Sequence, residues 1–326
     1  MQSKIRPKSR LPSIAAAAVI GSFLAAGSAW AQMDSLSIMA PASPGGGWDG
    51  TARAMQQALQ KENIVKNVEV TNVPGAGGTI GLAQFAGSSG QGDELMVSGL
   101  VMLGAILTNK SPVSLEQTTP IARLTGEYEV IVVPAASEIQ TLDDLVAKFK
   151  ADPRSVSWAG GSAGGTDHIL VGLIAEQVGV EPSGVNYIAF SGGGEALAAL
   201  LANDVTAGVS GLSEFAGQIA AGKLRGIAIS SPERLEGVDV PTLIEGGVNV
   251  DLVNWRAVVA PPGLDDAERQ QLLTTVDALA KSATWQSLLK ERNWMDSYLA
   301  GDEFAAFLEE DRARVEGVLK SIGLVQ

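Results

Sequence analysis

Short apolar runs alternate with amphipathic stretches along this chain of 326 residues. Short apolar runs predict strands, and stretches whose apolar residues recur every three or four positions predict helices. This alternation is typical of α/β proteins whose sheets are mostly parallel. The expected strands are 36–40, 68–73, 94–98, 129–133, 156–159, 185–190, 205–210 and 224–229. The helices expected between them are 51–63, 79–85, 141–149, 167–178, 194–202 and 212–221.

The end of the chain is predicted to be helical. From residue 255 the sequence leads through Pro261 and Pro262 into three amphipathic stretches, 265–282, 284–292 and 301–321. These helices need a surface to cover, and the first α/β unit has no other C-terminal partner. We therefore expect two lobes joined by two chain crossings that act as a hinge. The expected division is 32–127 plus 253–326 for lobe 1 and 128–252 for lobe 2.

Residues 1–31 are typical of a cleavable signal peptide. The segment 11–27 is apolar and small, and Ala29-Trp30-Ala31 fits the small-x-small cleavage rule. The apolar segment falls short of the roughly 20 residues that a membrane span needs. We therefore expect export and a mature chain that begins at Gln32. The basic residues at the start of the segment are Lys4, Arg6, Lys8 and Arg10.

The charge and the residue types present exclude several functions. Four of the 23 Lys and Arg residues and none of the 36 Asp and Glu residues lie in 1–31, so residues 32–326 carry 19 basic and 36 acidic residues, a net charge of −17. Nucleic acid and anionic membranes are poor partners for such a surface. The chain has one His and no Cys, which excludes the usual zinc and copper sites. We therefore expect no metal, no cofactor and no nucleic-acid partner.

Glycine-rich loops stand at several predicted strand-to-helix junctions. Three of them span 41–49, 74–79 and 160–168. A helix start carries unpaired N–H groups and a partial positive charge, and glycine lets a ligand approach that backbone closely. A fourth cluster, 191–194, follows another predicted strand, although its glycines could simply serve a tight turn. Loops of this kind predict an anion-binding cleft between two α/β units.

The first loop matches a dinucleotide-binding pattern, which we interpret differently. Residues 45–50 satisfy G-x-G-x-x-G, but a ribose-binding acid is missing where the next strand ends at Asn72-Val73-Pro74. We interpret Asp49 as the N-cap of the helix that starts at Thr51, because a carboxylate would repel an anion. Trp48 either shapes the pocket wall or packs against the helix.

The third loop contains a pattern found in serine hydrolases. Residues 160–164 match the G-x-S-x-G nucleophile elbow around Ser162. The base must be a histidine delivered from a late loop, and the only histidine, His168, lies six residues after the serine. This position would force His168 to reach back over the turn, which disfavours catalysis. An exported serine hydrolase remains the alternative function.

Several motifs, in this order, point to one family. They are APASPGGGWD at 40–49, TARA at 51–54, NVPGAGGT at 72–79, GSAGGTDH at 161–168, VPTL at 240–243, EGG at 245–247 and Trp255. Together with the signal peptide, they resemble the periplasmic receptors of tripartite tricarboxylate transporters (the TctC type). The resemblance covers essentially the whole mature chain. It implies a type II periplasmic-binding-protein fold, in which two α/β lobes close on a small carboxylate.

The resemblance also implies partners and a set of ligand-binding residues. The partners are a small organic di- or tricarboxylate and two integral-membrane transporter subunits, and we expect a periplasmic monomer without enzymatic activity. The residues implied in lobe 1 are Ser43, Pro44, Gly45, Gly46, Gly47, Trp48, Asp49, Gly75, Ala76, Gly77, Gly78 and Thr79. Those implied in lobe 2 are Gly161, Ser162, Thr166, Asp167, His168, Ser191, Gly192 and Gly193.

The three opening loops contain neither Arg nor Lys. A tricarboxylate would therefore rest on neutral donors unless Arg53, Arg123 or Arg256 turns inward. We interpret each of these arginines as solvated or paired at the surface. Neutral donors suit a mono- or dicarboxylate at least as well. A receptor for an amino acid, another monocarboxylate or a neutral solute therefore stays open as an alternative.

Overall fold

One long strand, β4 (Thr119–Pro134), joins the two halves of the sheet. The computed structural model describes residues 1–2 and 33–326, and the described residues form ten strands. Eight of them follow the order β2-β1-β3-β9-β4-β7-β5-β6, while β8 and β10 also pair with β4. The first half of β4 pairs with β9 and β10, and from Glu129 onward β4 pairs with β7 and β8.

The strands of the first lobe are partly parallel and partly antiparallel. The strand β1 pairs in parallel with β2 and β3, whereas β9 lies antiparallel between β3 and β4. In the second lobe, β5 pairs in parallel with β6 and β7. The other strands are β1 (Met33–Ala40), β2 (Val65–Asn72), β3 (Glu94–Gly99), β5 (Ser157–Gly160), β6 (Asn186–Ala189), β7 (Ala207–Gly211), β8 (Leu224–Ile229), β9 (Val253–Ala260) and β10 (Met295–Ala300).

The expectation of mostly parallel sheets was wrong, because strands at the join were missed. Every pairing that β4 makes is antiparallel. The half of β4 before residue 129 carries Arg123, Thr125 and Glu127, so it does not read as an apolar run. The strand β9 stands where the chain was expected to enter its helical ending, and β10 is short and only partly buried. The lobe boundaries at 127/128 and 252/253 remain a prediction.

The helices follow the predicted order, with corrected ends. The helix α1 begins at Gly47, four residues before the expected start, and α3 was not predicted because it continues the apolar run of β3. Thr141 caps α4 as expected, since its hydroxyl accepts from the Asp144 N–H. The helices are α1 (Gly47–Lys61), α2 (Thr79–Phe85), α3 (Leu100–Thr108), α4 (Leu142–Ala151), α5 (Thr166–Val178), α6 (Gly193–Leu201), α7 (Leu212–Ala220), α8 (Asp266–Lys281), α9 (Ala283–Glu291) and α10 (Gly301–Ser321).

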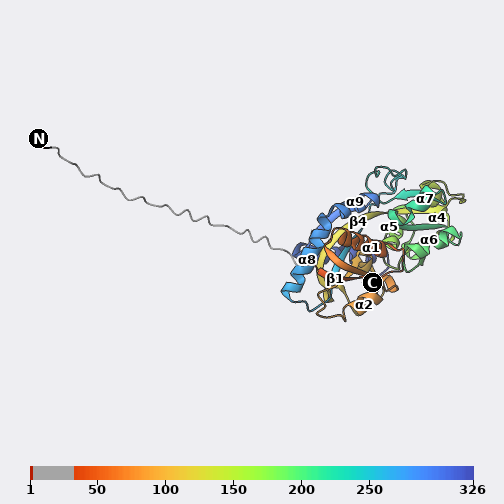
Figure 1. Ribbon diagram of the computed structural model, residues 1–326. Helices are drawn as coiled ribbons and strands as arrows, with labels where there is room; N and C mark the ends of the chain where they lie inside the picture. Colours follow the sequence, from red (N-terminus) through yellow and green to blue (C-terminus); the bar gives the residue numbers. More distant parts are fainter. Residues whose placement is uncertain (3–32) are drawn as a thin grey trace. The chain divides into compact units, whose positions relative to one another are not determined.

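The C-terminal helices cover the first lobe. The helices α8 and α10 contact β4, and α9 contacts α1. The helices of the second lobe, α4, α5, α6 and α7, lie together in Figure 1. A separate cluster of buried apolar residues around Val132, Leu200 and Phe215 belongs to this lobe alone. The larger apolar cluster contains residues of both lobes, such as Ile38 of β1 and Trp158 of β5.

The expected signal peptide lies outside the described residues, apart from Met1 and Gln2. Within 33–326, the helices are all too short or too polar to cross a membrane.

Candidate functional site

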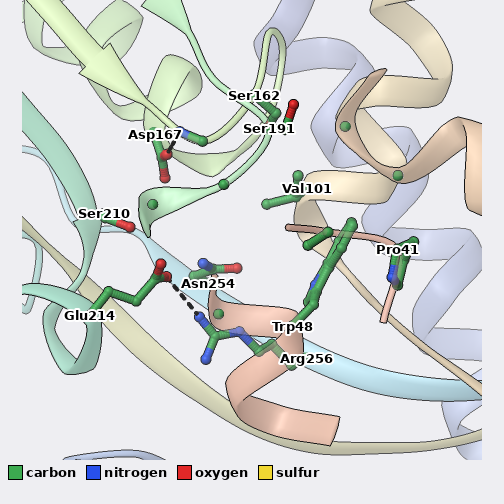
Figure 2. Close-up of a pocket in the computed structure, with 17 residues that line it drawn as sticks. Pro41, Trp48, Val101, Ser162, Asp167, Ser191, Ser210, Glu214, Asn254 and Arg256 are labelled. Carbon is green, nitrogen blue, oxygen red and sulfur yellow. Dashed lines mark hydrogen bonds and ion pairs between the residues drawn. The ribbon is translucent and has the colours of Figure 1, made fainter. Parts of the chain in front are cut away.

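A small cavity lies where residues of the two lobes meet. Its volume is about 50 Å³, and Figure 2 shows the side chains around it. Trp48 and Pro41 stand on one side, Asp167 and Glu214 on the other, and Asn254 and Arg256 come from β9 beneath. The lining residues are Pro41, Ala42, Gly47, Trp48, Gly77, Gly78, Val101, Gly161, Ser162, Asp167, Ser191, Gly192, Gly193, Ser210, Glu214, Asn254 and Arg256.

The N-terminal turns of five helices contribute to this lining. They do so through Trp48 of α1, Val101 of α3, Asp167 of α5, Gly193 of α6 and Glu214 of α7. The partial positive charge at each helix start raises the local potential. The protein's own carboxylates already occupy the first turns of α1, α5, α6 and α7, but not that of α3. The cavity therefore combines helix starts with acidic side chains.

Half of the twenty predicted ligand-binding residues line the cavity. These are Gly47, Trp48, Gly77, Gly78, Gly161, Ser162, Asp167, Ser191, Gly192 and Gly193. The other ten do not line it: Ser43, Pro44, Gly45, Gly46, Asp49, Gly75, Ala76, Thr79, Thr166 and His168. Contact of any of them with a ligand remains a prediction.

The first loop meets the fourth loop across the lobes. The Ser43 hydroxyl donates to a Glu195 carboxylate oxygen at 2.8 Å. A Cβ on Gly46 would lie 3.7 Å from the Cα of Gly192. These contacts join the first loop to the start of α6 and the glycines before it.

Asp49 does not cap α1, so the N-cap interpretation was wrong. The helix begins at Gly47, which places Asp49 in its first turn. Its carboxylate accepts from the Gly45 N–H, Arg53 Nε and Asn72 Nδ2, each at 3.0 Å. Burial alone would raise the pKa of Asp49, but these hydrogen bonds hold it below its usual value. Asp49 therefore stabilises the loop from behind and draws Arg53 away from the cavity.

The second loop is folded onto itself. The Thr79 hydroxyl donates to the Ala76 carbonyl at 2.9 Å, and Asn109 Nδ2 donates to the same oxygen at 2.8 Å. Gly78 has φ +89°, and a Cβ on it would collide with the Trp48 ring. Glycine is therefore required at 78 both for its backbone conformation and for the close approach of Trp48.

His168 is engaged in its own loop. Its Nδ1 accepts from the Gly164 N–H at 3.1 Å, and its ring stacks on Tyr187 with centroids 4.0 Å apart. Burial lowers the pKa of His168 to about 4. The Tyr187 hydroxyl donates to the Ser162 carbonyl at 3.0 Å. Among the described residues, no hydrogen bond joins the Ser162 and His168 side chains, as a nucleophile and its base would need.

Arg256 was interpreted as a solvated or surface-paired charge, and this was wrong. Its side chain is 2% exposed, because β9 lies in the middle of the sheet. It pairs with Glu127 of β4, and its Nη2 lies 3.7 Å from a Glu214 oxygen. A Cβ on Gly47 would collide with this guanidinium. Arg123 instead donates from Nε to the Ser297 carbonyl at 2.8 Å and lies outside the cavity lining.

The carboxyl groups around Arg256 differ in their surroundings. Glu127 accepts from Arg256, Trp294 Nε1 and both the N–H and hydroxyl of Ser213. Glu214 has fewer partners, and burial raises its pKa to about 8, against the attraction of Arg256. Glu214 therefore keeps its proton in most molecules at neutral pH.

Two buried carboxyl groups, Asp167 and Glu129, lie between the third loop and β9. Asp167 accepts from the Gly161 N–H. Asn254 Nδ2 donates to Glu129 Oε1 at 2.8 Å. Burial, followed by repulsion from Asp167 and Glu127, raises the pKa of Glu129 well above its usual range. Burial and the nearby carboxyl groups therefore favour the protonated form of Glu129.

Sequence reasoning missed Pro41, Ala42, Val101, Ser210, Glu214 and Asn254 as cavity residues. A signal for some of them was present. Ser210 and Glu214 flank a predicted strand-to-helix junction. Asn254 and Arg256 are two positions apart in a strand, so their side chains lie on the same face of the sheet. The second signal depends on recognising β9, which the expected helical ending concealed.

Residues 51–324 match the family described as the tripartite tricarboxylate transporter family receptor, TctC. The chain is 28% identical over 319 residues to the protein BugT of Bordetella pertussis, which covers 94% of this chain and 97% of BugT.

Solved structures share the fold. The periplasmic binding protein BugD superposes with a TM-score of 0.82 at 20% identity, covering 90% of this chain and 98% of BugD. MatC from Rhodopseudomonas palustris, solved with bound malate, gives 0.75 at 22% identity, covering 88% of this chain and 99% of MatC. The two-lobe periplasmic-binding-protein fold is therefore confirmed. Because the family match spans most of the sequence, this chain belongs to the TctC family of tripartite tricarboxylate transporter receptors.

Proposed function

We propose that this protein is a periplasmic receptor that captures a small organic carboxylate between its lobes and delivers it to two integral-membrane transporter subunits. Family membership supports the receptor role. We further propose that residues 1–31 direct export and are then removed, and that the receptor acts as a monomer without enzymatic activity.

The cavity between the lobes is the observation that carries this proposal. It is lined by first-turn residues of helices from both lobes, and glycines at 77, 78, 161, 192 and 193 leave backbone groups accessible. Backbone N–H groups at helix starts bind anions without basic side chains. We propose that the ten predicted residues that line the cavity contact the solute, whereas the other ten hold the loops in place.

The cavity favours acids with one or two carboxylates over a tricarboxylate. One lining side chain, Asp167, is itself an acid, and the lining cation, Arg256, is already paired. Each additional ligand carboxylate would add repulsion in a poorly solvated space. A volume of about 50 Å³ also admits only a small group while the lobes stand as described. Larger acids would need the lobes to move apart at the hinge. MatC, which shares this fold, was solved with bound malate, a dicarboxylate.

A serine hydrolase would need a base at Ser162. His168 instead accepts a backbone hydrogen bond from Gly164 and stacks on Tyr187. The arrangement therefore supports a binding role for the third loop, and we propose no reaction at Ser162.

A binding screen tests the proposal. Residues 32–326 would be purified and examined by thermal shift and calorimetry with mono-, di- and tricarboxylates, amino acids and neutral solutes. An acid present at 100 times its Kd should stabilise the fold by about 2.7 kcal/mol, which corresponds to a rise of several degrees in Tm. Ser162→Ala should weaken binding by about tenfold or more if its hydroxyl contacts the carboxylate. Binding of neutral solutes alone would refute the proposal, as would ester hydrolysis that disappears in Ser162→Ala.

A further inference from the structure

We infer that Asn254 presents a hydrogen-bond acceptor to the solute, so the protein selects acids that carry a hydroxyl or ammonium group over those that do not. The inference rests on the proposed function and specifies its substrate class. Neither Asn254 nor Glu129 was among the residues predicted from the sequence.

Of the two polar atoms of the Asn254 side chain, one is hydrogen-bonded and the other is not. Its residue is 5% exposed, and its amide nitrogen donates to Glu129. Its carbonyl oxygen, Oδ1, has no hydrogen-bond partner among residues 33–326. Figure 2 shows this oxygen directed into the space between Trp48 and Val101. A buried acceptor without a partner is unfavourable, so a solute that donates to it gains affinity.

The orientation of the amide is set by the groups behind it. Glu129 Oε1 lies behind the amide and accepts from Asn254 Nδ2 at 2.8 Å. Reversing the amide would place the Asn254 oxygen against this acceptor. Glu129 is therefore a positioning residue, since it keeps the acceptor side of Asn254 toward the cavity without touching the solute.

The neighbouring groups favour a donor at the same place. The side chain of Asp167 is a second acceptor that lines the cavity. Arg256 lies two residues from Asn254 on the same strand but is shared by Glu127 and Glu214. This wall therefore suits a hydroxyl or an ammonium group better than a second carboxylate.

Matched acids test the inference. Each set has one carbon skeleton and differs in a single substituent: propionate, L-lactate and L-alanine; succinate, L-malate and L-aspartate; glutarate, L-2-hydroxyglutarate and L-glutamate. Calorimetry on residues 32–326 should show at least one set in which a substituted acid binds about tenfold or more tightly than the unsubstituted one. The hydroxyl and ammonium members distinguish the two donor chemistries.

Two variants connect this preference to Asn254. Asn254→Leu should reduce the ratio of the two Kd values to within about twofold, mainly by weakening the substituted acid. Asn67→Leu, on the exposed part of β2, is the matched control and should leave every Kd unchanged. If Asn254→Leu does not fold, Glu129→Met provides the same test, because it frees the amide to reverse. Glu129→Gln should keep the preference, because its amide oxygen can accept from Asn254 Nδ2 as the carboxyl oxygen does.

The outcomes separate the inference from the proposed function. If acids bind but substituted and unsubstituted members bind equally, the inference is wrong and the proposed function stands. The inference also fails if the preference survives in Asn254→Leu, or in Glu129→Met where that variant replaces it. If no carboxylate binds at all, the proposed function fails and the inference with it.

Discussion

Arg256 on β9 lies 3.7 Å from Glu214 on α7 and pairs at the same time with Glu127 on β4. One buried cation thus joins elements of both lobes beneath the cavity. Arg256→Met leaves Glu127 without its cation in a buried site. Breaking a buried ion pair by removing one partner costs about 3–5 kcal/mol. We expect a loss of this size in the free energy of unfolding, measured by urea denaturation.

The control for this variant is an exposed ion pair. Arg269 pairs with Asp302 at 2.9 Å, with side chains 37% and 97% exposed. Arg269→Met should change the free energy of unfolding by less than about 1 kcal/mol. Equal effects of the two substitutions would contradict the structural role assigned to Arg256.

Gly47 is required by the guanidinium beside it. A Cβ at this position would collide with Arg256 and crowd a Glu214 oxygen. We expect Gly47→Ala to lower the free energy of unfolding by about 1–3 kcal/mol, as overpacking does. Because Gly47 lines the cavity, the same variant should weaken solute binding. Urea denaturation and calorimetry measure the two effects.

Gly50 in the same helix provides the comparison. A Cβ on Gly50 would meet only Arg292, at an ordinary contact distance of 3.5 Å. Alanine is a better helix former than glycine by about 0.5–1 kcal/mol. Gly50→Ala should therefore leave stability unchanged or raise it. Destabilisation at 50 as large as that at 47 would show that steric contact with Arg256 is not the cause.

The sequence predicts most of the fold because its strands and helices are locally patterned. Eight strands and the caps of helices such as α4 follow from apolar runs and capping residues. The first half of β4 and all of β9 do not, because both are defined by pairing between distant segments. Their residues are polar or lie in a continuous apolar run, so local periodicity carries no signal for them. The antiparallel centre of the sheet was missed for this reason.

The site is predictable only in part for a related reason. Glycine-rich junctions identify the backbone loops, and Trp48, Ser162 and Gly193 do line the cavity. The polar floor is supplied by Asn254 and Arg256 on the missed strand β9. Arginine side chains are mostly exposed in proteins, so the sequence alone favours an exposed position for Arg256. Only the placement of Glu127 and Glu214 beside it makes burial of Arg256 possible.

Glu214 should make stability decrease with pH. Its pKa is about 8 in the folded protein, above the ordinary 4.5, so the folded state holds a proton that the unfolded state has released. This stabilisation is complete below about pH 4.5 and is lost as the pH rises to 8. Glu214→Gln cannot titrate. We expect the variant to gain on the parent by up to about 1.4 kcal/mol per pH unit between pH 6.5 and 8.

Urea denaturation at a series of pH values measures this difference. The control is Glu195→Gln, because Glu195 also lies in the first turn of a helix but is exposed. Its difference from the parent should stay constant over the same range. A constant difference for Glu214→Gln as well would show that Glu214 is already ionised in the folded protein.

His168 should make stability decrease as the pH falls below neutral. Its folded pKa is about 4, below the ordinary 6.5, because burial favours the neutral ring. Protonation of Nδ1 would also place an N–H donor against the Gly164 N–H, from which Nδ1 now accepts a hydrogen bond. The unfolded chain therefore binds the extra proton between pH 6.5 and 4, and stability falls by up to about 1.4 kcal/mol per pH unit as the pH decreases.

His168→Phe keeps a ring to stack on Tyr187 but cannot titrate. It should be less stable than the parent at pH 7, and this deficit should shrink toward pH 4. A deficit that is independent of pH would mean that His168 is protonated equally in both states.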